Sequence, residues 1–346
     1  MNYIIFPVLL GLCAGLSFVP FGGEIRPAMG LVIYPFVMII LPVMDVILRP
    51  LQTPSDQLVH KVVHHIALAL VLPMVAGLIG VALWRLSSGA FQASDAVMMG
   101  AAVGMVSGAI GMTAAHELIH KSSKIWRGLG IGILVLVQYG HFRIEHIYGH
   151  HIHVGTLKDP ATARKGEGFY RFFVRVLITS YTSAMAIEAR RLRNRKESVF
   201  GLSNRLYHYL FLQGVVIALS YVIAGPLGLL FLAVQTLVAL VLTEAVDYIQ
   251  HYGLLRAVDA AGRAEPVAHH HSWNSRHAAG DWTTFNIGLH SHHHSHARCA
   301  YPELSQQPET HEMPGNYAVM IFMALLPPLW FHVMDHRLPI SHKPLS

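Results

Sequence analysis

The chain has 346 residues, of which 53% are hydrophobic and 13% are charged, and its formal net charge is +6. Soluble domains carry about 25% charged residues. A mean hydropathy of +0.45 is too high for a chain that buries its apolar surface in one water-soluble core. These values exclude a soluble protein and indicate an all-α integral membrane protein, which we expect to be a single domain over residues 1–346. Anionic lipid at the inner membrane face explains the basic charge better than nucleic acid does.

Six segments are long and apolar enough to cross about 30 Å of hydrocarbon. These predicted transmembrane helices are 3–19, 31–48, 65–83, 97–115, 207–224 and 227–246. The first lacks a basic leader and a small-residue cleavage site, so we expect it to be retained. Two shorter apolar stretches predict buried or interfacial helices, and a segment that mixes aliphatic and basic residues predicts a helix along the membrane surface. The short stretches are 129–139 and 318–330, and the mixed segment is 171–195.

Basic residues are distributed unevenly between the loops. They gather after the second span and in segment 121–205, whereas the opposite loops carry only Arg26 and Arg85. The positive-inside rule therefore places the N-terminus and segment 121–205 on the cytoplasmic side of the cell inner (plasma) membrane. The fourth span ends near His116, and the fifth and sixth spans return the chain to the same side near His251. We therefore expect a histidine-rich site on the cytoplasmic side.

The two cysteines restrict the available redox chemistry. Cys13 lies in the first span and Cys299 in a loop, so we expect no disulfide. The sequence has no Cys-x-x-Cys pair that would bind an iron-sulfur centre or a rubredoxin-type iron. Any electrons must therefore come from a separate protein.

Three histidine motifs lie beyond the ends of apolar segments: His116-Glu-Leu-Ile-His120, Glu145-His-Ile-Tyr-Gly-His-His151 and His290-Ser-His-His-His294. His116 and His120 are four residues apart and share one helix face. Taken alone, this HExxH pattern is the signature of zinc peptidases, in which Glu117 would be the general base.

The second and third motifs favour more than one metal. His146 and His150 are again four residues apart, whereas His151 is rotated by about 100° from its neighbour on a helix. Adjacent histidines that face different ways suit two metals, and His290, His293 and His294 repeat this arrangement. A single zinc needs about three protein ligands and a water, so the three motifs offer too many imidazoles for it.

The motifs together resemble the membrane alkane 1-monooxygenase (alkane omega-hydroxylase) family and its xylene monooxygenase relatives, within the membrane fatty acid desaturase and hydroxylase superfamily. The resemblance covers most of the chain and includes Tyr139-Gly-His-Phe142, Asp159-Pro-Ala161, Asp247-Tyr-Ile-Gln-His-Tyr-Gly-Leu254 and His270-His-Ser-Trp-Asn274. It implies a non-haem di-iron site whose ligands are almost entirely histidine. Carried over motif by motif, the ligands are His116, His120, His146, His150, His151, His251, His290, His293 and His294.

The resemblance also implies a reaction. The terminal methyl of a medium-chain n-alkane is hydroxylated with O₂ and two electrons, which a rubredoxin or a ferredoxin-type carrier with its reductase supplies. We expect the hydrocarbon to arrive through the bilayer by an apolar tunnel between spans two, three, four and six. Tyr34 and Phe36 are candidate lining residues, although core packing is their simpler role. An acidic carrier is expected to dock on the basic run 190–196.

The chain departs from the alkane branch near the presumed ligands. Asp247 and Gln250 replace Asn and Glu of the fourth motif, and His292 stands where the branch has Asp. Gly288 and Leu289 replace Gln-Arg. These changes leave a xylene-type methyl hydroxylase, a fatty-acyl desaturase or a decarboxylase as alternatives. A zinc peptidase and a non-enzymatic metal-binding protein also remain, and metal analysis would separate them.

The remaining polar residues near the motifs have weaker assignments. Four carboxylates are expected to hydrogen-bond to ligand imidazoles, with direct ligation or ordinary helix capping as alternatives: Glu117, Glu145, Asp159 and Asp247. One histidine set repeats the ligand spacing and is interpreted as interfacial, with an accessory metal or proton-relay role as the alternative: His60, His64 and His65. Others are expected to have structural, lid or solvent-facing roles: His141, His153, His269, His270, His271, His292 and His296.

Overall fold

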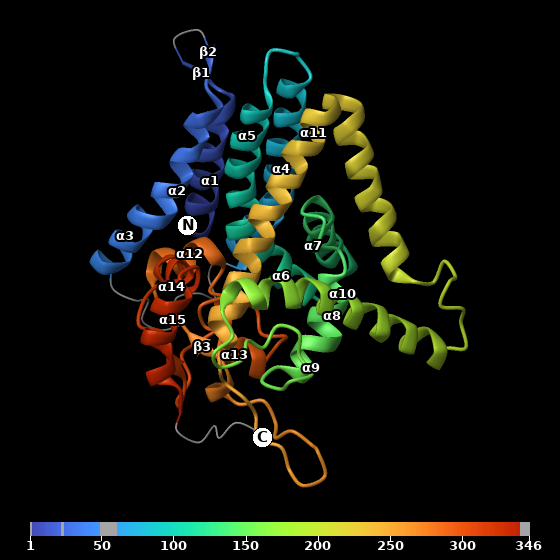
Figure 1. Ribbon diagram of the computed structural model, residues 1–346, viewed down its shortest axis with the longest axis vertical. Coiled ribbons are helices and arrows are strands. Elements are labelled where there is room, and N and C mark those ends of the chain that lie inside the picture. The colour runs from blue at the N-terminus through green and yellow to red at the C-terminus, as the bar shows by residue number, and fades with distance from the viewer. Residues whose placement is uncertain (1, 22–23, 49–60, 340–346) are drawn as a thin grey trace.

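The computed structural model describes residues 2–21, 24–48 and 61–339 (Figure 1). Its elements are helical apart from two two-stranded sheets, β1 (Pro20–Phe21) with β2 (Glu24–Ile25) and β3 (Trp273–Asn274) with β4 (His311–Glu312). The first pair is antiparallel and the second parallel. The all-α class predicted from composition is therefore confirmed.

The N-terminal third forms apolar helices with frequent interruptions. Helix α1 (Asn2–Gly15) continues into the 3₁₀ turn η1 (Leu16–Phe18). The apolar run Pro27–Ile47 follows, and it comprises η2 (Pro27–Val32), α2 (Ile33–Pro35), the π-helix η3 (Phe36–Ile40) and α3 (Leu41–Ile47). Helix α4 (Lys61–Leu86) is unbroken and packs against α1. His60, which was expected at the start of this region, lies outside the described residues.

Two longer units carry the chain toward the histidine motifs. The first is a continuous helix built from α5 (Ala93–Val106), the π-helix η5 (Ser107–Met112) and α6 (Thr113–Ile119). The second is α11 (Arg205–His251), which is interrupted at Gly225. Gly225 has φ 57°, a conformation that favours glycine, and Pro226 begins the returning half. Figure 1 shows the two halves of α11 as an inverted V, so this element contains the fifth and sixth predicted spans.

Within the described ranges, five helices are long and apolar enough to cross a membrane, or six if the bent pair Tyr317–Ala324 and Pro327–Arg337 counts as one span. The pair bends by 120°, and it comprises α14 (Tyr317–Ala324), α15 (Pro327–Met334) and η9 (Asp335–Arg337). The first predicted span corresponds to a shorter apolar helix, Asn2–Phe18. Helix α10 (Phe169–Asn194) also passes by length and composition. However, α10 runs across the bundle in Figure 1, as expected for a helix along the membrane surface.

A stripe of small residues brings α5 and η5 against the returning half of α11. A Cβ added at Gly100 would lie 2.8 Å from the carbonyl oxygen of Phe231, and one at Gly104 would lie 2.7 Å from Val238 Cβ. Gly108 meets Leu242 in the same way, at 2.8 Å. This small-xxx-small spacing lets two backbones approach closely inside a membrane. Gln235 Nε2 also donates to Ser107 Oγ at 2.9 Å across the same contact.

Replacing Gly104 with valine is expected to destabilise the bundle, because the added carbons meet backbone and Cβ atoms that cannot move aside. Overpacking of this kind costs about 1–3 kcal/mol. A lower thermal unfolding temperature in detergent would measure the loss. Gly77→Val is the matched control, because a Cβ at Gly77 on α4 has no neighbour within 4 Å. Equal unfolding temperatures for the two variants would contradict the packing argument.

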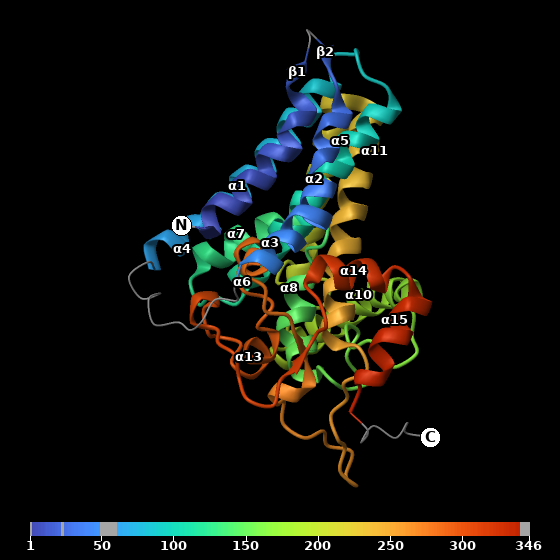
Figure 2. The ribbon, with the colours of Figure 1, turned by 90° about the vertical axis from the view of Figure 1, so that its left-hand side faces the viewer.

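The histidine motifs lie on short elements at one end of the bundle, where Figures 1 and 2 place α6, α8, α13 and the end of α11. The remaining short elements are α7 (Lys124–Leu136), α8 (Phe142–Glu145), the π-helix η6 (His146–His150), α9 (His151–His153), η7 (His269–His271), α12 (Ala278–Thr284), α13 (His290–Ser295) and η8 (Tyr301–Glu303). An aromatic core that includes Tyr248, Tyr252 and Trp330 supports this end. The convergence of the motifs at one end follows from the two crossings made by α11.

Candidate metal centre

The structure gathers the nine predicted ligands into two groups. Group A contains the histidines of the first motif, two of the second and one of the third: His116, His120, His146, His151 and His293. Group B contains His150, His251, His290 and His294. Within each group the candidate ligand nitrogens all lie within 4.8 Å of one another.

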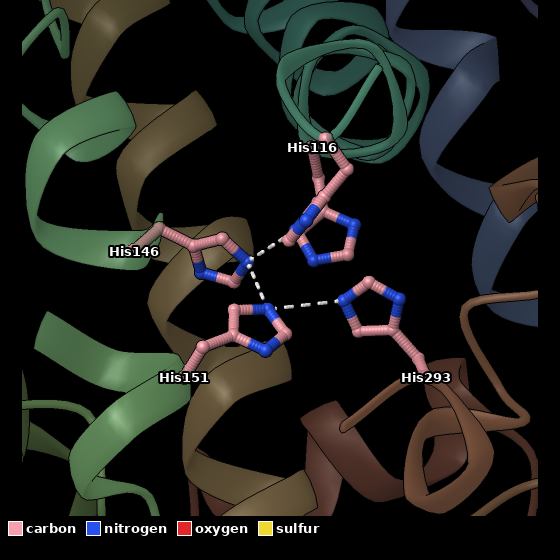
Figure 3. A group of neighbouring side chains, drawn as sticks. His116, His146, His151 and His293 are labelled. Atoms are coloured by element: carbon pink, nitrogen blue, oxygen red, sulfur yellow. Dashed lines mark hydrogen bonds between the residues drawn. The ribbon is translucent and has the colours of Figure 1, made fainter. Parts of the chain in front are cut away.

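In group A the imidazole rings point toward one another from α6, η6, α9 and α13, as Figure 3 shows for His116, His146, His151 and His293. His146 Nε2 lies 3.1 Å from His120 Nε2 and 3.0 Å from His151 Nε2. His293 Nε2 lies 3.2 Å from His151 Nε2. The His116 ring lies 4.5 Å from the rings of both His146 and His293, measured between centroids. Group A thus presents five nitrogens to one small space.

Group B is more deeply buried and equally compact. His294 Nε2 lies 3.2 Å from His150 Nε2 and 2.9 Å from His290 Nε2. His290 Nε2 lies 3.0 Å from His251 Nε2 at the end of α11. The two groups adjoin, because the ring centroids of His151 in group A and His294 in group B are 4.6 Å apart.

The arrangement of these nitrogens suits coordination of divalent metal ions better than hydrogen bonds between the rings. A neutral imidazole nitrogen carries either a proton or a lone pair, so it cannot donate to one neighbour and accept from a second. His146 Nε2 and His294 Nε2 each face two other Nε2 atoms. If a metal ion lies about 2.1 Å from each of two nitrogens and the two bonds meet at a right angle, the nitrogens are about 3.0 Å apart. This distance matches the observed spacing. His116 Nε2 is also buried with no hydrogen-bond partner among the described residues.

The imidazoles are held in the form that binds metal. Burial lowers the pKa of His146, His151 and His293 well below the usual histidine range, and neighbouring histidines lower it further. The same causes lower the pKa of His290 and His294. Neutral rings leave a lone pair for a transition metal, and all-nitrogen donor sets suit iron, zinc or copper.

The second motif is divided between the groups. His146 and His150 lie in the π-helix η6 and their rings stack with centroids 5.2 Å apart. His146 joins group A, His150 joins group B, and His151 returns to group A. The sequence indicated that adjacent histidines face different ways. It did not indicate that the four-residue pair is also separated.

Asp159 orients one histidine of group B. Its Oδ2 accepts a hydrogen bond from His150 Nδ1 at 3.0 Å and from Thr162 Oγ1 at 2.6 Å, while its Oδ1 accepts from the Ala161 N–H at 3.1 Å. Burial opposes ionisation, but the His150 ring and these donors outweigh it and hold the pKa of Asp159 below its usual range. A carboxylate on the far nitrogen of a ligand fixes the tautomer that binds metal through Nε2.

The other three predicted carboxylates have different partners. Glu117 pairs with Lys121 and accepts from the Tyr301 N–H at 3.3 Å. Glu145 accepts from Ser183 Oγ at 3.4 Å. Asp247 is buried on α11, where its electrostatic neighbours are other carboxylates. The predicted bond to a ligand imidazole is therefore present for Asp159, whereas the contacts of Glu117 and Glu145 run to other groups.

The histidines outside the two groups have separate surroundings. His64 Nδ1 lies 2.6 Å from Tyr301 OH, and His65 packs against Trp126. His271 accepts from the Ala268 N–H through Nδ1 and contacts Glu265 through Nε2 at 3.1 Å, forming a third compact group with His270. A ring that accepts at Nδ1 carries its proton on Nε2, so this group is poorly arranged for metal. His292 likewise accepts from the Ser305 N–H, at 3.0 Å.

One buried ionisable residue, Glu244, was not identified from the sequence. Glu244 lies on the returning half of α11, and its Oε1 accepts from Tyr139 OH at 2.7 Å. Its exposed fraction is 1%. An ionisable residue inside an apolar span is by default a functional candidate, and that signal was present in the sequence.

An apolar cavity lies on the bilayer side of the centre. Its lining includes Met38 and Leu41 of the second predicted span, Met105 and Thr113 of the fourth, and Leu242 of the sixth. Thr113 stands one helical turn before His116, so the cavity approaches group A. Tyr34 and Phe36 pack against the main core instead of lining this cavity.

A bundle of membrane-length apolar helices with two polyhistidine groups at one end defines a multi-pass membrane protein with a candidate metal centre. The profile of the fatty acid desaturase family matches residues 94–324. The alkane 1-monooxygenase 1 of Pseudomonas aeruginosa is 39% identical over 68% of this chain and 62% of its own length. The alkane 1-monooxygenase of Pseudomonas putida is 32% identical over 86% of this chain and 75% of its own length.

A third relative is the hydroxylase component of a xylene/toluene monooxygenase from Pseudomonas putida, which is 29% identical over 96% of this chain and 86% of its own length. The chain belongs to the fatty acid desaturase family and is a membrane enzyme of its alkane 1-monooxygenase type. The predicted family is thereby confirmed.

Proposed function

We propose that this chain is a non-haem di-iron monooxygenase that hydroxylates the terminal methyl of medium-chain n-alkanes, and that the whole chain works as one membrane domain. The observation that carries the proposal is the division of nine histidines into two adjoining groups. The reaction uses O₂, two electrons and two protons. One oxygen atom enters the C–H bond as a hydroxyl, and the other leaves as water.

Iron bound at groups A and B supplies the O₂ activation that amino-acid side chains cannot provide. The side chains themselves hold the iron and orient the ligand rings. Asp159 fixes the His150 ring, and the burial of the ligand imidazoles keeps bulk water from the reacting atoms. The apolar lining of the cavity next to Thr113 suits a hydrocarbon, and we propose it as the last part of the substrate path.

The proposed site faces the cytoplasm, where a separate rubredoxin or ferredoxin-type protein delivers electrons. Arg190, Arg193, Arg195 and Lys196 are exposed at the end of α10, whereas Arg191 is bound to the buried Glu188. The exposed set offers a basic surface for an acidic carrier.

Reversing the charge at Arg193 and Arg195 is expected to slow reduction of the enzyme and to reduce its salt dependence, because steering by opposite charges raises association rates at low ionic strength. Stopped-flow reduction across a salt series would measure both effects. Arg263→Glu is the control, since Arg263 is exposed on another loop and pairs with Asp259. Unchanged kinetics in the α10 variant would move the docking site elsewhere.

Product analysis tests the reaction. Purified protein is loaded with Fe²⁺ under anaerobic conditions, its metal content is measured, and it is then given ¹⁸O₂, a reducing system and a panel of n-alkanes, xylenes and fatty acids. We expect two irons per chain and a labelled terminal alcohol from n-alkanes. Unsaturated products without label would favour a desaturase. A single zinc with group B empty would reject the di-iron proposal.

The second candidate is a methyl hydroxylase for alkyl aromatics. The relative that acts in a xylene/toluene monooxygenase aligns with 96% of this chain. Labelled benzylic alcohols formed in preference to alkanols would favour it. Both candidates use the same two histidine groups.

A further inference from the structure

A chain of hydrogen-bonding side chains connects the partly buried His141 with the interior. His141 Nε2 lies 3.3 Å from Ser180 Oγ on α10, and Ser180 Oγ lies 3.4 Å from Tyr139 OH. Tyr139 OH then donates to Glu244 Oε1 at 2.7 Å. Ser180 and Tyr139 are buried, with exposed fractions of 5% and 2%. Three parts of the chain that are distant in sequence thus meet in one polar line through an apolar region.

The inner end of this line has a free acceptor. Glu244 Oε2 is buried and has no hydrogen-bond partner among the described residues. A buried carboxylate oxygen left unpaired is costly, so a proton on it or a transient donor must stabilise it. Glu244 lies three residues before Asp247 and seven before His251 on the same helix.

Glu244 belongs to a set of buried carboxylates that interact electrostatically with one another: Glu145, Asp159, Glu244 and Asp247. One member, Asp159, is bonded directly to His150 of group B. The polar line therefore ends on the returning half of α11, the helix that carries His251 of group B.

We propose that His141, Ser180, Tyr139 and Glu244 form the path by which protons reach the metal centre. The proposal rests on the proposed function, because a monooxygenase must bring two protons to a site from which bulk water is excluded. A structural tie between the loop at Tyr139 and α11 would need only the Tyr139–Glu244 bond. The line continues through Ser180 of α10 to His141, which is partly exposed.

The transfer moves one proton for each passage and leaves every group with its original charge. Glu244 would pass its proton toward the metal centre, where the reaction consumes it, and Tyr139 O–H would replace that proton. Tyr139 takes a proton from Ser180 O–H, and Ser180 takes one from His141 Nε2–H. His141 then binds a proton from outside at Nδ1, and rotation of the hydroxyls and exchange on the ring restore the starting arrangement. The two electrons come from the carrier, so the path itself carries no redox change.

The surroundings of His141 suit this role. Its ring packs edge-on against Tyr139 and Tyr181, with centroids 4.6 and 5.1 Å away. Burial lowers the pKa of His141 to about 4, so the ring is neutral at physiological pH. A neutral ring passes a proton from one nitrogen to the other without becoming a stored cation.

Infrared spectroscopy of the metal-free protein gives a test that needs neither iron nor substrate. A buried protonated carboxyl has a C=O band that shifts when its proton exchanges for deuterium, and the band lost in Glu244→Gln belongs to Glu244. We expect Tyr139→Phe and Ser180→Ala each to slow this exchange by roughly 10²-fold, the lower end of the contribution of a positioned proton-transfer group. Tyr181→Phe and Thr182→Ala, which make the same changes beside the path, should exchange like the unaltered protein.

Turnover of the iron-loaded enzyme gives the second measurement. Tyr139→Phe and Ser180→Ala should release more H₂O₂ for each electron pair and should show a larger solvent isotope effect, with the iron content unchanged. Native exchange rates in both variants, or the absence of a Glu244 band, would overturn the proposal. If Tyr139→Phe does not fold, Ser180→Ala still decides the matter. Because the infrared result is independent of product chemistry, failure of the monooxygenase assignment would be seen separately.

Discussion

Replacing His293 with alanine is expected to abolish hydroxylation while the protein still inserts into the membrane. His293 is the histidine that α13 contributes to group A, and its Nε2 lies 3.2 Å from His151 Nε2. Removing it opens one position of the five-nitrogen group and leaves group B complete. We expect metal affinity at group A to fall by more than about 10²-fold, the upper end of the loss for outer partners of a ligand.

Metal analysis and helix content measured on the same preparation separate loss of metal from loss of fold. His296→Ala is the matched control, because His296 lies three residues further along, outside both groups. It should retain both metals and full turnover. A fully active His293→Ala enzyme, or equal damage from His296→Ala, would show that the two groups are assigned incorrectly.

Replacing Asp159 with asparagine is expected to weaken group B without changing the shape of the side chain. One oxygen of Asp159 accepts from His150 and Thr162, and the other accepts from the Ala161 N–H. An amide offers only one acceptor atom, so in either orientation its NH₂ group faces a donor. Loss of such a partner lowers metal affinity or activity by about 10–100-fold.

A chelator titration of each metal would measure this effect, and group A should keep its affinity. Thr162→Val should have a smaller effect, because it removes one donor to Asp159 and leaves the bond to His150 in place. Asp259→Asn, in an exposed loop, is the control that should change nothing. Unaltered affinity in Asp159→Asn would mean that the His150 ring is oriented by packing alone.

The sequence predicted that the histidine motifs converge because the motifs lie at the ends of helices. His116 ends the fourth predicted span and His251 ends the sixth, so counting membrane crossings was enough to bring their motifs to one end of the bundle. His290, His293 and His294 lie on a separate short helix, and the resemblance to the family joined them to the site. The apolar spans could also be predicted from the sequence, because their mean hydropathy is high.

The division of the nine histidines between the two groups could be seen only in the structure. Regular helical periodicity places His146 and His150 on one face, and their rings do stack, yet their nitrogens belong to different groups. Glu117 was expected to bond to a ligand ring, but it forms an ion pair with Lys121, four residues further along. The bond between Tyr139 and Glu244 joins residues 105 positions apart, a distance over which local patterns carry no information.

The close contact between the two glycine-lined helices has a consequence for electronic coupling. Gly100, Gly104 and Gly108 hold one helix against another, the first leading to His116 of group A and the second ending at His251 of group B. Packing between these two helices therefore helps to set the gap between groups A and B. A bulkier residue in the stripe would widen that gap with all nine histidines intact, and magnetic exchange between the irons of the proposed di-iron form would report it.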